Sequence, residues 1–164
     1  MARSCFFVLL LILFALGCGE SVEEKAMEKR SKDATGGKTE VDLSEKGMKV
    51  TGETEKGKYA FSSGESIEIP KDFPTDVLIY SPAKIVMAMK MPEGHSVSLT
   101  TTNDVTEVTK TYQKEMKAKG WSEETSMNMG AQSMLMYKKE NRVASIVIAQ
   151  VDDGTQISVT VATD

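Results

Sequence analysis

Methionine is the residue type whose spacing in this sequence points most directly to chemistry. The chain holds 11 methionines in 164 residues. Residues i and i+2 of a strand lie on the same face, so thioethers spaced in this way can converge. Thioethers are soft ligands that select Cu(I). Seven methionines have this spacing: Met87, Met89 and Met91, then Met127 and Met129, then Met134 and Met136.

The same alternation has two other interpretations. A half-buried strand needs an apolar side chain at every second position, and methionine is an adaptable core residue. It is also common on binding surfaces that adapt to a partner. We interpret the pairs first as core packing, and keep the binding surface and the Cu(I) site as alternatives. A metal site requires several thioethers near solvent, whereas a core buries them.

Residues suited to catalysis are sparse. His95 is the single histidine, and we expect it to be exposed beside a turn. The two cysteines, Cys5 and Cys18, both belong to the N-terminal segment described below. A zinc site or a Cys–His dyad is therefore not expected. The sequence indicates no catalytic residue, no cofactor and no metal-ligand set, and we expect a protein that is not an enzyme.

The segment Gly52–Tyr59 comes close to a phosphate-binding loop. Its two glycines and Lys58 have the required spacing, but Tyr59 stands where the motif needs a serine or threonine for Mg²⁺. Glu53 and Glu55 would also repel a phosphate. We interpret the segment as a hairpin turn bounded by glycines.

The N-terminal residues have the composition of a signal segment. Arg3 supplies a positive charge, and residues 5–16 are apolar. As a helix this run would rise about 18 Å, which is short of the ~30 Å hydrocarbon core of a bilayer. A charged start, a short apolar run and small residues before a cut describe a segment that is removed after export.

The stretch Ala15-Leu16-Gly17-Cys18 resembles the end of a bacterial lipoprotein signal peptide. The resemblance implies a signal peptide over residues 1–17 and fatty acyl chains on Cys18, although leucine is commoner than Ala15 at its position. Gly19 replaces the aspartate that marks inner-membrane retention in enterobacteria. We expect a lipid-anchored protein of the cell envelope, on the outer membrane facing the periplasm if the host has two membranes. An ordinary signal peptide or an uncleaved anchor is the alternative.

Composition limits the remaining possibilities. The net charge of −4 argues against nucleic-acid binding, which requires clustered Lys and Arg. No cysteine is left to form a disulfide once Cys18 carries lipid. Residues 18–47 are polar and charged, and predict a flexible tether, with a partner-binding helix over 21–32 as the alternative. Residues 48–164 predict a single domain.

Most of this domain has the alternating pattern of β-strands, with one amphipathic helix. Asp104 followed by Glu107 predicts the start of the helix, and Gly120 predicts its end. Pro70, Pro74 and Pro82 exclude a helix across 69–82, which we expect to cross the core in extended form. Strands are predicted over 48–51, 58–61, 66–69, 85–91, 96–100, 134–138, 142–151 and 156–161. The fold class predicted is α+β, with one helix packed on an antiparallel sheet of about four to six strands in two layers.

Residues 65–164 resemble a stretch found in small uncharacterised bacterial envelope lipoproteins. The residues that carry the resemblance are Ile69–Val77 with Tyr80 and Ala83-Lys84, and the pattern Val108-x3-Tyr112-x3-Met116 followed by Gly120-Trp121. It implies a shared domain and no particular activity. The helix followed by Gly-Trp is also similar to the helix-grip domains of a lipoprotein subunit of the outer-membrane β-barrel assembly machinery, which implies a helix-grip arrangement.

These observations favour a non-enzymatic protein-interaction or assembly accessory at the membrane. Its partners would be the membrane, through the lipid on Cys18, and another envelope protein. The alternative is a lipoprotein that binds a small ligand, or a soft metal such as Cu(I) through the Met-x-Met pairs. A binding module requires an exposed apolar patch or an unpaired sheet edge, whereas a ligand binder requires a concave pocket.

Overall fold

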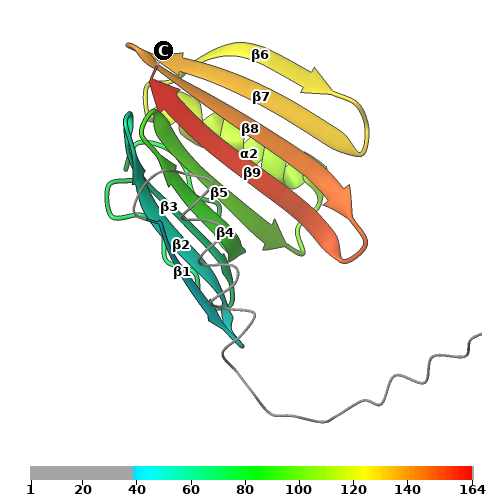
Figure 1. The fold of residues 1–164 in the computed structure, drawn as a ribbon. Helices are drawn as coiled ribbons and strands as arrows, with labels where there is room; N and C mark the ends of the chain where they lie inside the picture. The colour runs from blue at the N-terminus through cyan, green and yellow to red at the C-terminus, as the bar shows by residue number, and fades with distance from the viewer. Residues whose placement is uncertain (1–38, 164) are drawn as a thin grey trace, which may run out of the picture.

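A computed structural model describes residues 39–163 of the chain, and Figure 1 shows its fold. The predicted signal peptide, Cys18 and the tether up to residue 38 lie outside the described residues. The described part consists of β1 (Thr39–Ser44), β2 (Gly47–Thr54), β3 (Gly57–Gly64), β4 (Lys84–Met91), β5 (Gly94–Thr101), α2 (Val105–Ala118), β6 (Ser122–Asn128), β7 (Gln132–Lys139), β8 (Arg142–Val151) and β9 (Gly154–Thr163).

All nine strands form one antiparallel sheet in the order β1-β2-β3-β4-β5-β9-β8-β7-β6. Of the described residues, 58% are in strands and 11% in the helix. The predicted α+β domain with a helix on four to six strands is therefore wrong, because the molecule is mostly one large sheet. Strand β1 adds residues 39–44, which composition assigned to the tether, and β6 adds residues 122–128, for which no strand was predicted.

The helix covers one face of the sheet, which we call the inner face; the opposite one is the outer face (Figure 1). Core residues of the inner face alternate along the central strands, and include Val97 and Leu99 of β5 and Ile157 and Val159 of β9. The helix is neither long nor apolar enough to span a membrane.

The predicted signals at both ends of the helix are confirmed. The Asp104 side chain accepts a hydrogen bond from the Glu107 amide at 2.9 Å. At the other end, the Trp121 amide donates to the Met116 carbonyl and the Gly120 amide donates to the Lys117 carbonyl, each at 3.0 Å. This pattern needs a left-handed residue, and Gly120 has φ of +82°. The chain leaving the helix is thereby turned so that Trp121 enters the core.

The proline-rich segment between β3 and β4 lies on the inner face beside the helix. Its Phe73, Val77 and Tyr80 are buried in the same core as the helix residues, so the expected packing of this segment into the core is confirmed. The extended form is not, because turns from Pro70 to Phe73 and from Pro74 to Val77 interrupt the segment. Residues 66–69, predicted as a strand, belong to this irregular segment. The Tyr80 ring stacks on that of Tyr112, which is fully buried in α2. Burial raises the pKa of the Tyr112 phenol.

Candidate functional site

His95 occupies a different environment from the one we predicted. It is on the inner face, and its side chain is 14% exposed. Its Nε2 lies 3.2 Å from a carboxylate oxygen of Asp72, and its ring meets the Phe73 ring edge-on at 5.9 Å. Lys90 also binds Asp72. This hydrogen bond from Lys90, opposed by burial and helped by His95, lowers the pKa of Asp72 to about 2. The expectation of an exposed turn histidine is wrong, because the proline-rich segment covers β5 at this point.

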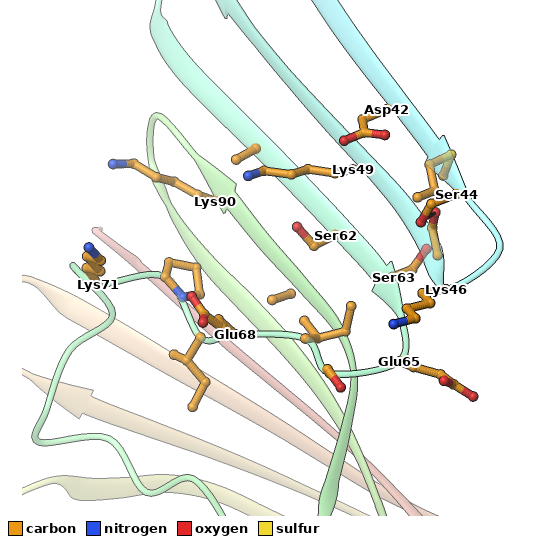
Figure 2. A pocket seen from close by; sticks show the side chains of 18 residues that line it. Asp42, Ser44, Lys46, Lys49, Ser62, Ser63, Glu65, Glu68, Lys71 and Lys90 are labelled. Carbon is orange, nitrogen blue, oxygen red and sulfur yellow. Dashed lines mark hydrogen bonds between the residues drawn. The ribbon is translucent and has the colours of Figure 1, made fainter. Parts of the chain in front are cut away.

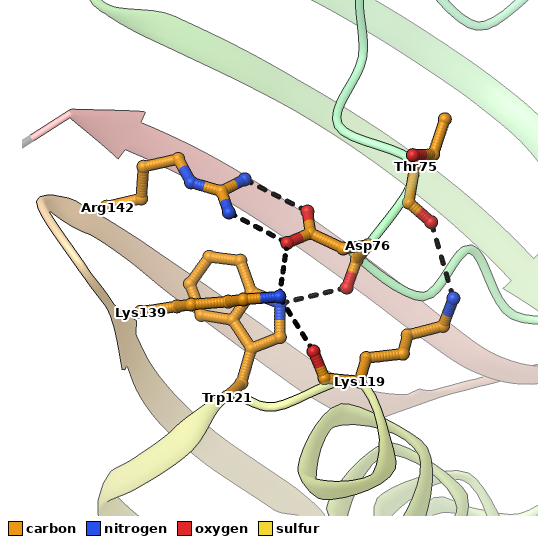
Figure 3. A network of polar contacts seen from close by, with 6 residues as sticks. All are labelled: Thr75, Asp76, Lys119, Trp121, Lys139 and Arg142. Atoms are coloured by element: carbon orange, nitrogen blue, oxygen red, sulfur yellow. Dashed lines mark hydrogen bonds and ion pairs between the residues drawn. The ribbon is translucent and has the colours of Figure 1, made fainter.

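A second polar network surrounds Asp76 (Figure 3). Arg142 donates to both carboxylate oxygens, at 2.9 and 2.7 Å. Lys139 donates to the same carboxylate at 2.8 Å and to the Lys119 carbonyl at 2.8 Å. The Trp121 indole donates to the Asp76 carbonyl at 2.8 Å, and the Arg142 guanidinium lies 5.0 Å from the centre of its ring.

This network holds the proline-rich segment to the helix end and to the β7–β8 hairpin. The hydrogen bond from Arg142, opposed by burial and helped by Lys139, holds the pKa of Asp76 well below its ordinary value. Both oxygens of the carboxylate are engaged by cations, so it has no spare capacity to act as a base. We therefore assign the network a structural role.

A groove lies between the inner face of β1–β4 and the start of the proline-rich segment (Figure 2). Its volume is about 410 Å³, which is within the usual size range of ligand sites. As in most ligand pockets, more of its lining is apolar than polar, with Ile67, Ile69 and Pro70 beside lysines, carboxylates and hydroxyls. The side chains that Figure 2 labels are Asp42, Ser44, Lys46, Lys49, Ser62, Ser63, Glu65, Glu68, Lys71 and Lys90. This mixed lining selects no particular class of ligand.

The outer face differs from the rest of the molecule in its lack of charge. Charged residues make up 27% of the sequence. Away from the bulges in β4 and β6, the strand register places only two charged residues of the described strands on this face, Lys84 and Lys138. Within residues 39–163, the helix and the proline-rich segment both pack on the inner face. An uncharged face of this extent is the feature that most needs a functional explanation.

Apolar side chains form two clusters on the outer face, one at each side. The N-terminal cluster lies on β1–β4 and consists of Val41, Leu43, Met48, Val50, Phe61, Met87, Met89 and Met91. The C-terminal cluster lies on β6–β8 and consists of Met127, Met134, Met136, Val143, Val147 and Ala149. Between them runs a hydroxyl stripe, formed by Ser96, Ser98, Thr100, Ser145, Ser158 and Thr160.

The methionine pairs belong to this outer face, so their first interpretation as core packing is wrong. Met87 and Met89 are half-buried beside the hydroxyl stripe. Met127 is 45% exposed and Met136 is 36% exposed. Met129 is 61% exposed in the turn after β6. Among residues 39–163 the methionine of the core is Met116, on the helix. Burial was predicted from strand alternation, which does not tell which face is covered.

Three other features singled out in the sequence are the Gly52–Tyr59 segment, possible metal ligands and Cys18. The segment Gly52–Tyr59 is the end of the β2–β3 hairpin, as predicted, with Thr54 paired to Gly57 across the turn. Within the described range, no group of three or more His, Cys, Asp or Glu side chains is placed to hold a metal ion. Cys18 lies outside that range.

Comparison with known families gives one match, to the part of the chain from β4 to β9. Residues 85–162 match a family model described as START domain-like. The match covers slightly less than half of the chain, and includes α2, the hydroxyl stripe and the C-terminal cluster. No curated protein and no solved structure matches the chain. The START domain-like match supports a ligand-binding domain and is compatible with a non-catalytic binding role.

Proposed function

We propose that this protein is a non-catalytic binding protein of the cell envelope, anchored by lipid on Cys18, that holds a protein partner against its outer face. The observation that carries the proposal is the lack of charge on that face, where the register places only Lys84 and Lys138 among the described residues outside the bulges. The START domain-like match supports a binding role.

A protein partner fits the outer face better than a small ligand does. A small ligand is normally enclosed in a concave pocket, whereas the two clusters and the hydroxyl stripe extend across the whole sheet. Contact surfaces of proteins are depleted in charge and enriched in methionine and aromatic side chains. Phe61 and the methionines of both clusters match that composition.

Affinity capture from gently solubilised membranes tests this function. We expect Met134→Lys to reduce the yield of the captured partner about tenfold or more, because a lysine in a desolvated contact leaves a buried charge without a partner. Thr106→Lys is the control, since it adds the same charge on the helix, away from the outer face.

Cys18→Ala tests the anchor in the same experiment. We expect this variant to leave the membrane fraction, because stable attachment of such a protein depends on its acyl chains. A partner captured equally by Met134→Lys and the parent chain would contradict the use of the outer face. Retention of Cys18→Ala in the membrane would contradict the lipid anchor.

A second candidate function, Cu(I) binding, is favoured by the pairing of β6 with β7. Met127 lies directly opposite Met134, and Met136 follows two residues later on the same face. Opposite side chains in an antiparallel pair have Cβ atoms about 5 Å apart, and diagonal ones are within reach of long side chains. Three thioethers can therefore converge on one soft ion near solvent.

Titration with Cu(I) in the presence of a chromophoric competitor measures this site. We expect one equivalent to bind, and Met134→Leu, which keeps the volume and removes the sulfur, to weaken binding about tenfold or more. Met89→Leu, in the N-terminal cluster, serves as the control. Equal affinity in Met134→Leu and the parent chain would exclude the site.

A further inference from the structure

We propose that the occupant of the outer face is a second copy of this chain, packed face to face about a two-fold axis that runs along the hydroxyl stripe. This inference rests on the proposed use of the outer face for binding and names the partner. The product would be a sandwich of two nine-stranded sheets, with a helix on each outside. Three properties of the face support it: its symmetry, its area and its charge.

The symmetry follows from the strand order. An axis parallel to the strands, between β5 and β9, places β4 of one copy over β8 of the other, β3 over β7, and β2 over β6. The N-terminal cluster of each copy then meets the C-terminal cluster of its partner, and the hydroxyl stripe meets itself. The strands of the two sheets stay nearly aligned, as in β-sandwiches, in which the sheets lie about 10 Å apart.

The pairs of positions brought together also match in chemistry. Met87 would face Val147 and Met91 would face Val143, while Met89 would face Ser145. Phe61 would face Met136, with Met134 one pair further along β7. Within the stripe, the hydroxyls of Ser96 and Thr160 already bind each other at 3.0 Å. These two hydroxyls therefore keep a hydrogen-bond partner when the second sheet covers them. The side chains of the stripe are also small, so the two sheets can approach closely.

The area of the face is sufficient for a stable dimer. Nine strands spaced about 4.8 Å apart and about 25 Å long span roughly 1,000 Å². A stable interface of standard size needs about 800 Å² from each partner. The twist of the sheet reduces the area in contact, but the remaining area is still of the order that a stable interface needs.

Charge explains why this face rather than another would meet its copy. Each chain has a net charge of −4, so two copies repel each other through most of their surface. The outer face carries no acidic residue in the register of the described strands outside the bulges. The groove on the inner face, in contrast, holds Asp42, Glu65 and Glu68.

Cysteine cross-linking of the full chain in isolated membranes tests the dimer. Gln156→Cys, exposed on the outer face of β9 next to the axis, is expected to give a dimer of twice the mass with a short bis-maleimide, relative to the parent chain. Phe61→Cys and Met134→Cys, on two differently tagged copies, are expected to cross-link to each other. Ser62→Cys, the neighbour of Phe61 that points to the inner face, is the matched control and should not cross-link to Met134→Cys.

Charge exchange tests the same contact, with the Gln156→Cys cross-link as its readout. Met134→Lys and Phe61→Glu, each alone, are expected to abolish the Gln156→Cys dimer. Both changes in one chain should restore it, because each new lysine would lie diagonal to a new glutamate across the axis, within reach of its long side chain. Restoration excludes misfolding as the cause of the single losses.

The outcomes separate this inference from the proposed function. A Gln156→Cys chain that stays monomeric overturns the dimer, whether another protein or residues 19–38 of the same chain cover the face. If Met134→Lys still reduces capture of a different protein, the outer face remains the binding surface. If Met134→Lys changes neither capture nor cross-linking, both proposals fail.

Discussion

Trp121→Ala is expected to lower the free energy of unfolding by about 3–5 kcal/mol, the usual range for truncation of a buried tryptophan. Trp121 is 2% exposed and belongs to the main core. Its truncation would also remove the indole hydrogen bond to the Asp76 carbonyl and the ring beneath Arg142. Single domains are stable by about 5–15 kcal/mol, so this change would use up much of the total.

Urea unfolding followed by circular dichroism measures the effect, because Trp121 is the single tryptophan and its fluorescence is lost in the variant. Met129→Ala is the control, since this side chain is also large and apolar but is 61% exposed; we expect a change within about 0.5 kcal/mol. A loss below about 1 kcal/mol for Trp121→Ala would contradict the packing described for the helix end.

Asp76→Asn has the second largest expected effect, a loss of about 2 kcal/mol. Hydrogen bonds to charged groups contribute about 1.5–3 kcal/mol each. The asparagine keeps the shape but leaves two cations, Arg142 and Lys139, without their anion. The side chain of Asp76 is 28% exposed, so solvent screens part of the interaction and we place the value in the lower part of the range.

The pH dependence of this loss has a defined sign. The pKa of Asp76 is lower in the folded state than its ordinary value of about 3.9 in an unfolded chain. Its stabilising contribution is therefore complete above about pH 5 and is lost as pH falls through the folded-state pKa. The difference between the parent chain and Asp76→Asn should be constant from pH 8 to about pH 5, and shrink in more acidic solution. A difference that grows on acidification would be inconsistent with the network.

The sequence predicted well those elements whose signals are local. The helix limits followed from Asp104 and Gly120. The two edge strands, β1 and β6, could not be predicted in the same way. Their residues are mainly polar, since an edge strand has a neighbour on one side only, and their pairing depends on the strand beside them. The missing edges are the main reason that the sheet is larger than expected.

The sequence predicted that methionines would gather on one face of the sheet, but it did not predict which face. Alternation predicted Ile85, Met87, Met89 and Met91 on one face of a strand. This is correct for the three methionines and wrong for Ile85, which pairs with buried Leu99 on the inner face. Which face the methionines occupy depends on a bulge between Ile85 and Met87, after which Ala88, and not a methionine, lies beside buried Val97. A bulge changes the face of the sheet on which every later side chain of the strand lies. No residue type in this stretch predicts the bulge.

The junction between β3 and β4 has a consequence for the dynamics of the sheet. β3 contacts β4 through four residue pairs, Ala60 to Ser63, while β2 and β3 pair along their whole length. The first three strands therefore resemble a cooperative unit of their own, which is joined to the rest of the sheet by the short pairing between β3 and β4. Such units open by local unfolding while the remaining fold stays intact. The amides of β1–β3 should accordingly exchange with solvent hydrogen sooner than those of β5, β8 and β9.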